Sequence, residues 1–132
     1  MQTDARNPQH WFDIAEEDLV RAHRRFIEAD FKDCLQPSAE KIMKGKLVAL
    51  GWPLQKTHDL AVLGVALQSF RVDCTWFEET ADVLATEYIA DRYPGFDDAP
   101  PDATELRTFV EDTRKLFESL TGRKYQGPAL PS

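Results

Sequence analysis

The sequence predicts an all-α domain, an antiparallel up-and-down bundle of about five helices. Apolar residues recur at the three- and four-residue spacing of a helix face, and the alternation typical of β-strands is missing. Proline and glycine stop signals divide these segments, and the links between them are short. Short links favour antiparallel neighbours in a bundle. We expect residues 1–132 to form one domain, with 123–132 as a frayed tail.

The first predicted helix has a clear start signal and one apolar face. Asn7 is a suitable N-cap, and Pro8 occupies the first helical position, where its missing N–H group costs little. The apolar face consists of Trp11, Ala15, Leu19, Ala22 and Phe26. Asp18 interrupts this face. Because a buried carboxylate needs a partner, we expect Asp18 to pair with Lys41 or Lys44.

The second helix is expected to follow Asp30 and to end at Gly51. Its inward seam would consist of Ala39, Ile42, Met43, Leu47 and Leu50. Pro37 lies inside this segment, and a proline beyond the first turn removes a backbone hydrogen bond. The helix therefore either kinks at Pro37 or begins its regular part near Leu35.

The third helix, expected from His58 to about Ser69 with Thr57 as its cap, is apolar nearly all round. A helix of this kind is predicted to be the buried one. Gly45 and Gly64 lie inside predicted helices, where each costs about 1 kcal/mol relative to alanine. We expect at least one of them to mark a close approach between two helices.

The last two helices are expected at residues 75–93 and 103–120. In the fourth helix the inward positions would be Phe77, Ala81, Leu84, Ala85, Tyr88 and Ile89. Pro94 ends it, and the proline-containing segment 95–102 is predicted to be a loop. The fifth helix has an apolar face of its own, and Gly122 is its expected stop signal.

The charge distribution excludes some functions. A net charge of −7 argues against a protein that coats DNA without specificity. The charges are uneven, however, because residues 21–56 contain eight Lys/Arg against four acids, while 76–118 contain twelve acids against four bases. One half could therefore face a polyanion while the other repels it, although solubility and pairing between helices explain the same pattern.

Several motifs are missing from the sequence, and their absence limits the expected cellular compartment and the expected cofactors. Cys34 and Cys74 form no C-x-x-C motif, which suits reduced thiols. No signal peptide or membrane span is visible, so we expect a cytoplasmic protein. There is neither a glycine-rich phosphate loop nor a metal-ligand cluster of zinc spacing, and we expect no cofactor and no metal.

Three polar clusters could carry chemistry. On spacing alone, Glu40 and Lys44 form an exposed stabilising pair on the second helix. Thr57 as a cap and Asp59 in the first turn are explained by helix formation. His58 between them is not, and it lies at a helix start whose free N–H groups suit a phosphate or carboxylate.

The third cluster closes the fourth helix. Arg92 in a last turn is favoured by the helix dipole, so a structural explanation is available. The functional alternative is that its guanidinium binds a phosphate or carboxylate while Tyr93 stacks on a base.

Taken in order, four short motifs resemble the HEPN family of prokaryotic helical domains, over roughly residues 11–96. They are Trp11 with Asp18-Leu19, Ala39-Glu40-Lys41 with Lys44, Thr57-His58-Asp59-Leu60, and Tyr88 with Arg92-Tyr93-Pro94. The resemblance implies a helical bundle that is commonly dimeric and binds nucleotide or RNA. Such proteins are often encoded beside a small nucleotidyltransferase as a toxin–antitoxin pair, and many are metal-independent ribonucleases.

Two departures from the family pattern matter. Nuclease members carry an Arg-x4-6-His motif, whereas none of His10, His23 and His58 has an arginine at that spacing before it. Pro37 also stands where relatives usually have glutamine. The leading hypothesis is therefore a non-catalytic HEPN-like binding protein. Its expected partner is a nucleotidyltransferase in a toxin–antitoxin-type module.

In this hypothesis one polar cleft takes a nucleotide phosphate or an acidic surface of a partner. Its lining residues would be Lys41, Lys44, His58, Arg92 and Tyr93, and the structural residues would be Trp11, Asp18, Glu40, Thr57 and Asp59. His58 and Arg92 should share one end of the bundle, because in an antiparallel pair the start of one helix lies beside the end of the next.

Two alternatives stay open. One is a ribonuclease toxin with His58 as general base and Arg92 as the group that stabilises the phosphate. The other is a structural dimerisation module whose charges only form salt bridges. We also expect a homodimer, because Trp11, Phe12 and Phe77 are more aromatic surface near helix ends than a small bundle needs to bury.

Overall fold

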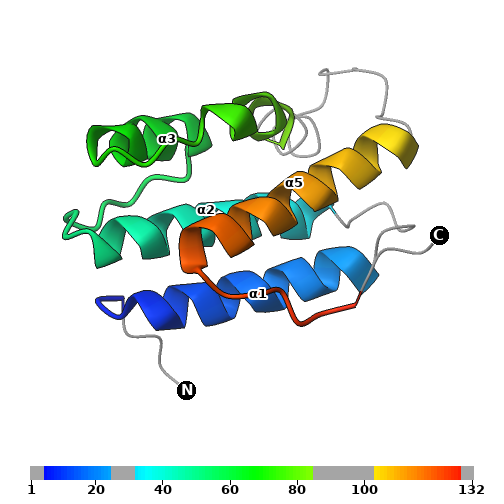
Figure 1. The fold of residues 1–132 in the computed structure, drawn as a ribbon, viewed down its shortest axis with the longest axis horizontal. Coiled ribbons are helices and arrows are strands. Elements are labelled where there is room, and N and C mark those ends of the chain that lie inside the picture. The colour runs from blue at the N-terminus through cyan, green and yellow to red at the C-terminus, as the bar shows by residue number, and fades with distance from the viewer. Residues whose placement is uncertain (1–4, 25–31, 85–102, 129–132) are drawn as a thin grey trace.

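The computed structural model describes residues 5–24, 32–84 and 103–128, and these contain helices and no strand. The side chains of residues 32, 33, 103 and 106 are outside this description. The elements are α1 (Pro8–Arg24), α2 (Lys32–Ala49), α3 (Leu60–Ser69), the 3-10 turn η1 (Thr75–Phe77) continued by helical residues 78–84, and α5 (Ala103–Thr121) (Figure 1). The predicted all-α fold is confirmed.

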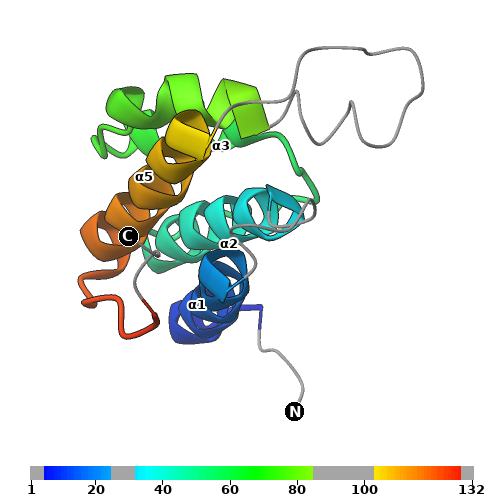
Figure 2. The ribbon, with the colours of Figure 1, turned by 90° about the vertical axis from the view of Figure 1, so that its right-hand side faces the viewer.

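Helix α2 lies at the centre of the bundle. It packs against α1, α3 and α5, and α1 also contacts α5, so that α1 and α3 lie on opposite sides of α2 (Figure 2). The side chains that fill the space between these helices include Leu19, Leu35, Ile42, Leu47, Leu63, Phe77, Leu116 and Phe117. Most of the predicted inward positions of α1 and α2 are in this core. Leu50 is an exception, since it lies beyond the end of α2 and is exposed.

The predicted start and stop signals act mostly as expected. The Asn7 side chain accepts a hydrogen bond from the Gln9 N–H group at 3.0 Å, at the start of α1. Gly51, two residues after the end of α2, has a φ of +89°, and the N–H group of Trp52 donates to the Leu47 carbonyl at 2.9 Å. Gly122 ends α5 in the same left-handed region, with a φ of +72°.

The cap of α3 is a correction. The N-cap is Asp59, whose carboxylate accepts the Ala61 N–H group at 2.9 Å, and the helix begins at Leu60. Thr57 was predicted to be the cap. Its hydroxyl instead accepts the Asp59 N–H group at 3.2 Å, which shapes the approach to the helix. Both residue types are good caps, and an aspartate also neutralises the positive end of the helix dipole.

Pro37 lies inside α2, which begins at Lys32 rather than near Leu35. The proline nitrogen cannot donate to the carbonyl one turn earlier. The residues on either side of Pro37 make side-chain contacts across the bundle. The Ser38 hydroxyl donates to the Ala15 carbonyl of α1 at 2.8 Å, and the Gln36 amide donates to the His58 carbonyl at 3.2 Å.

The burial of α3 also corrects the sequence-based prediction. Only the side containing Leu60, Leu63 and Leu67 is buried, against α2. The opposite side is exposed, with Val62 at 44% and Val65 at 71% of their full accessible surface. Helix α3 has the most apolar sequence of the described helices, but it lies at the edge of the bundle (Figure 2).

Gly45 marks the expected close approach between helices. A Cβ atom at this position would lie 2.6 Å from Cε1 of Phe12 and 2.8 Å from Cβ of Trp11, so α1 could not pack as closely against α2 if the residue were larger. Gly64 has no such role, because a Cβ atom there would meet nothing within 4 Å. One of the two predicted positions is therefore confirmed.

The segment after α5 is not frayed up to residue 128. Arg123 donates to the Asp13 carboxylate at 2.7 Å and also contacts the Gln9 side-chain oxygen, while the Gln126 N–H group donates to Glu16 at 3.3 Å. These contacts fasten residues 123–128 to α1. No helix in the described ranges is long and apolar enough to cross a membrane.

Candidate functional site

The candidate site is a polar cluster on the face of α2 that meets the link to α3. Gln36, Glu40 and Lys44 are spaced four residues apart, so they lie above one another on a single helix face. Glu40 and Lys44 are only 8% and 5% exposed. A pair that the spacing predicts to be exposed is therefore buried, because α2 is covered on several sides by its neighbours.

Glu40 is the centre of this cluster. One carboxylate oxygen accepts the Lys44 ammonium at 3.0 Å, and the other accepts His58 Nδ1 at 2.9 Å. The Gln36 amide lies 3.5 Å from the same carboxylate. Because a carboxylate can only accept here, His58 carries its proton on Nδ1, which leaves Nε2 for an external partner.

His58 differs from the rest of the cluster in its exposure. Its side chain is 78% exposed, while its Glu40 partner is buried. Lys56, two residues earlier, is also exposed and has no partner among the described residues. The His58 imidazole and the Lys56 ammonium are therefore exposed to solvent, whereas the charged groups of Glu40 and Lys44 are buried.

Trp11 covers the buried end of the cluster. The Lys44 ammonium lies 5.9 Å from the centroid of its ring, within the range of a cation–π contact. The indole N–H group donates to the Ala5 carbonyl at 2.9 Å, which fixes the ring at the start of α1. Trp11 therefore contributes a packing contact to this cluster.

Asp18 forms the expected ion pair with Lys41. The Lys41 ammonium lies 2.6 Å from one carboxylate oxygen of Asp18, and Arg21 lies 3.0 Å from the other. Asp18 is buried, whereas the side chains of its two partners are 28% and 57% exposed. The two cations thus hold a buried carboxylate at the α1–α2 interface.

These contacts change the picture of an open cationic cleft. Lys44 is buried against Glu40 and Trp11, and Lys41 is neutralised by Asp18. Asp59 occupies the N-terminus of α3, where the sequence suggests a place for a phosphate. Arg92 and Tyr93 lie outside the described residues. The proximity of Arg92 to His58 therefore stays a prediction. Of the predicted anion-binding residues within the described ranges, His58 is the one that stays well exposed.

Gln36 is the residue of this cluster that the sequence-based interpretation missed. It links the Glu40 carboxylate to the backbone carbonyl of His58, so it fixes the α3 link against α2. Its spacing from Glu40, one helical turn earlier on the same face, is the signal that points to it.

A second buried polar cluster joins α1 to the segment after α5. His23 Nδ1 donates to the Leu19 carbonyl at 2.8 Å, and the imidazole stacks on Tyr125 with ring centroids 4.7 Å apart. His23 Nε2 and the Tyr125 hydroxyl are buried without a hydrogen-bond partner in the described part of the chain. Burial lowers the pKa of His23 and raises the pKa of Tyr125 to about 12, so both are neutral at pH 7.

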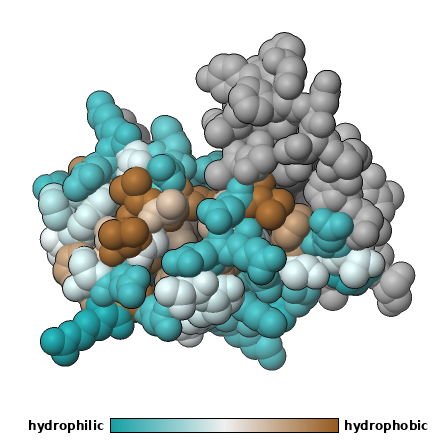
Figure 3. Space-filling model, turned by 90° about the horizontal axis from the view of Figure 1, so that it is seen from above, coloured by the Kyte–Doolittle hydropathy of each residue, from teal (hydrophilic) through white to brown (hydrophobic). Residues whose placement is uncertain are grey.

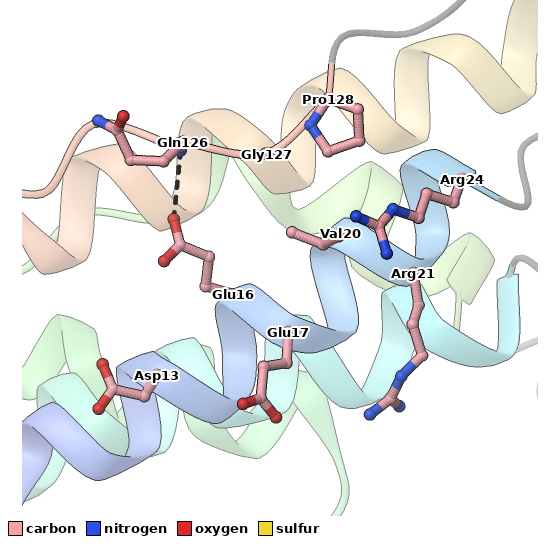
Figure 4. Close-up of a pocket in the computed structure, with 9 residues that line it drawn as sticks. All are labelled: Asp13, Glu16, Glu17, Val20, Arg21, Arg24, Gln126, Gly127 and Pro128. Atoms are coloured by element: carbon pink, nitrogen blue, oxygen red, sulfur yellow. Dashed lines mark hydrogen bonds between the residues drawn. The ribbon is translucent and has the colours of Figure 1, made fainter.

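A hollow with a volume of about 880 Å³ lies between α1 and residues 126–128 (Figure 4). Glu16 points toward Gln126 across it, and Arg24 lies at its other end beside Val20. None of the predicted site residues within the described ranges lines this hollow, so those residues and the hollow do not coincide.

Metal and thiol chemistry find no support in the described residues. These residues contain no group of three or more His, Cys, Asp or Glu side chains that could hold a metal ion. Cys34 and Cys74 are free and buried. Burial, with a smaller contribution from Asp73, raises the pKa of Cys74 to about 11, which keeps this thiol protonated and unreactive.

A comparison with protein families agrees with the four motifs and with the helical fold. The model of the HEPN domain matches residues 8–123. The chain belongs to the HEPN domain family. The match includes α5, so it extends beyond residues 11–96, over which the motifs resemble the family. No curated protein and no solved structure matches the chain.

Membership of the HEPN family supports a nucleotide- or RNA-associated function in general, and HEPN domains commonly dimerise. The aromatic argument for a dimer fails, however, because Phe12 and Phe77 are 3% and 0% exposed in the core of this HEPN domain. These two side chains are used for internal packing, whereas Trp11 is partly buried and Trp76 is 45% exposed.

Proposed function

We propose that this HEPN domain binds a nucleotide or RNA and acts with a nucleotidyltransferase partner in a toxin–antitoxin-type module, without nuclease activity of its own. The observation that carries the proposal is the contact of exposed His58 with buried Glu40. It orients the imidazole so that Nε2 faces outward. In its protonated form Nε2 donates to a phosphate oxygen, and in its neutral form it accepts from a base N–H group.

The surroundings of His58 favour binding over catalysis. Lys56, two residues before His58, is exposed and has no partner among the described residues, so its ammonium is available to a second phosphate oxygen. The chain lacks the Arg-x4-6-His motif of the nuclease members. The remaining cations of the cluster, Lys41 and Lys44, are bound to carboxylates and serve to hold Glu40 and Asp18 in place.

Direct binding measurements test this proposal. Fluorescence anisotropy with a labelled single-stranded RNA, and calorimetry with ATP, would give the affinity of the wild type and of His58→Ala. A lost hydrogen bond to a charged group is worth about 1.5–3 kcal/mol, so the affinity should fall at least about tenfold. Lys115→Ala, which removes an exposed charge on α5, is the matched control and should bind as the wild type does. Equal affinities of wild type and His58→Ala would refute the site.

A second function, that of a metal-independent ribonuclease, is favoured by the same carboxylate–imidazole pair. A buried carboxylate on Nδ1 is the arrangement that fixes the tautomer of a catalytic histidine and lets Nε2 accept a proton. In this alternative His58 is the general base and Arg92 stabilises the phosphate. Cleavage of a labelled RNA in the presence of a chelator, lost in His58→Ala, would establish it and replace the first proposal.

The partners are proposed on the family relation alone. Sedimentation at tens of micromolar, a concentration of about the right order for an interface of standard size, tests the homodimer. Co-elution of the chain with a nucleotidyltransferase encoded beside it tests the heteromeric partner. If His58→Ala changes no binding and the oligomer persists, the third reading, a structural dimerisation module, takes precedence.

A further inference from the structure

The outer face of α3 is an apolar surface without any charge. From Leu60 to Phe70 the sequence contains no Asp, Glu, Lys or Arg. Val62 and Val65 project from this face, and Ala61 beside them is also exposed. Figure 3, which views the molecule from the α3 side, shows apolar side chains gathered there with hydrophilic ones around them. Contiguous apolar surface of this kind marks interaction sites on soluble proteins.

A groove runs along this face between α3 and residues 74–82. Its volume is about 170 Å³, and its lining includes the buried side chains of Leu60, Phe77 and Ala81. Gly64 and Val65 lie on the α3 side of the groove. Because Gly64 has no side chain and a Cβ atom there would meet nothing within 4 Å, the groove stays open at its middle. An apolar side chain of a partner could enter it.

The other side of the groove is acidic. Glu78 and Asp82 line it, and the segment 72–84 contains Asp73, Glu78, Glu79 and Asp82 but neither Lys nor Arg. Glu78, Glu79 and Asp82 are exposed. The surface therefore combines an uncharged apolar strip on α3 with an acidic strip one groove away.

We propose that this surface docks a helix of another protein that carries an apolar ridge flanked by Lys or Arg. The apolar ridge would occupy the groove and cover Val65, as in other helix-in-groove complexes, while the basic flank would face Glu78 and its neighbours. Complementary charge at the edge of an apolar contact adds specificity and speeds association. This surface is separate from the His58 cluster, so the inference goes beyond the proposed function.

A second copy of this chain fits the surface less well. It would bring the same acidic strip and an α3 face without bases, and each copy carries a net charge of −7. Like charges placed across an interface are unfavourable. The charge pattern thus favours a basic partner over self-association through α3.

A pair of synthetic peptides tests the chemistry of the occupant. The probe is a helical peptide of about 18 residues with leucines at the a and d positions and lysines on both flanks, and the control carries glutamates in place of the lysines. Calorimetry should show binding of the lysine peptide, weakened by salt, and none of the glutamate peptide. Equal binding of the two peptides would overturn the charge argument.

Two matched variants test the location. Val65→Asp should weaken binding of the lysine peptide at least about tenfold, since a buried unpaired charge is costly. Leu54→Asp makes the same change at an exposed leucine of the α2–α3 link and should leave binding unchanged. Both variants add negative charge, so general attraction to the peptide cannot produce the difference. Circular dichroism and a Val65→Gln variant show whether the fold is kept.

Three results would overturn the proposal: unchanged peptide binding in Val65→Asp, an equal loss in Leu54→Asp, or a wild-type dimer that Val65→Asp converts to a monomer. The last result would identify the α3 face as the contact between two copies of the chain. Analytical ultracentrifugation of the wild type and both variants distinguishes it from the expected outcome, in which Val65→Asp leaves the oligomeric state as it is.

Discussion

Helices α2 and α3 lie side by side, but they handle burial in opposite ways. The sequence of α2 contains lysines and acids throughout, and yet Glu40 and Lys44 are almost completely buried. The sequence of α3 contains no charged residue, and yet Val65 is mostly exposed. Burial in this domain therefore does not follow the polarity of a helix.

Position in the bundle explains the difference. Helix α2 has neighbours on three sides, so Glu40 and Lys44 are covered, and these two buried charges are tolerated because each is paired with the other. Helix α3 packs against α2 and is open on its outer side. Paired charges inside and unpartnered apolar groups outside indicate different roles. The first holds the candidate site in place, and the second is available to another molecule.

The largest effect is expected from Glu40→Ala. This change leaves the Lys44 ammonium buried without an anion, and breaking a buried pair from one side costs about 3–5 kcal/mol. Urea unfolding should show that loss in the free energy of unfolding. The double variant Glu40→Leu, Lys44→Met removes both charges and should recover most of it. If the single variant is as stable as the wild type, the buried charges of α2 do not need each other, and the comparison with α3 fails.

Gly45→Ala should destabilise the domain by up to about 2 kcal/mol. The added Cβ atom would lie 2.6 Å from the Phe12 ring and 2.8 Å from Cβ of Trp11, so α1 must shift. Overpacking of this kind costs about 1–3 kcal/mol, which exceeds the gain of about 1 kcal/mol from helix propensity. Thermal and urea unfolding both report it. A stabilised variant would mean that α1 can move away from α2 without loss.

Gly64→Ala should have the opposite sign, with a gain of up to about 1 kcal/mol from helix propensity alone. Nothing in the described structure lies within 4 Å of the added atom. The measurement is best made in a Val65→Asp background, because a bound partner or second copy at this face would add its own contribution to stability. A clear loss of stability in that background would show that α3 is covered by a part of the chain itself.

The pH dependence of stability tests an ionisable group that is buried in its neutral form, the side chain of His23. His23 is neutral, and its Nε2 has no hydrogen-bond partner in the described part of the chain. Burial lowers its pKa below the ordinary value of 6.5. A hydrogen bond to Leu19 and the charge of Glu111 act in the opposite direction, and the charge of Arg114 adds to the lowering. The unfolded chain therefore takes up a proton before the folded one does. Stability should be fully present above pH 6.5 and should fall as the pH decreases from there toward the folded pKa.

Urea midpoints between pH 7.5 and 5, a range chosen to span about one unit on each side of an ordinary histidine pKa, would show this effect. His23→Phe keeps an aromatic ring against Tyr125 and should flatten the curve, while the other histidines contribute equally to both proteins. An identical pH dependence in the variant would mean that His23 is as protonated in the fold as in the unfolded chain.

Several local features could be predicted from single residues. The N-cap at Asn7, the stops at Gly51 and Gly122, and the Asp18–Lys41 pair follow from backbone geometry and from the cost of an unpaired buried carboxylate. The cap of α3 could not be decided in the same way, since Thr57 and Asp59 are both good caps two residues apart. The Gln36 contact to the His58 carbonyl depends on where the α3 link crosses α2.

By itself, the sequence determined the helical class, the approximate helix ranges and the family, because periodicity, caps and short motifs are local or depend on spacing alone. Only the tertiary structure decided that Lys44 is buried, that α3 is exposed on its outer side, and that residues 123–128 are fastened to α1 by Arg123 and Tyr125. The physical reason is that burial and electrostatic pairing depend on which elements become neighbours. That choice is made by packing over the whole chain, and no single helix encodes it.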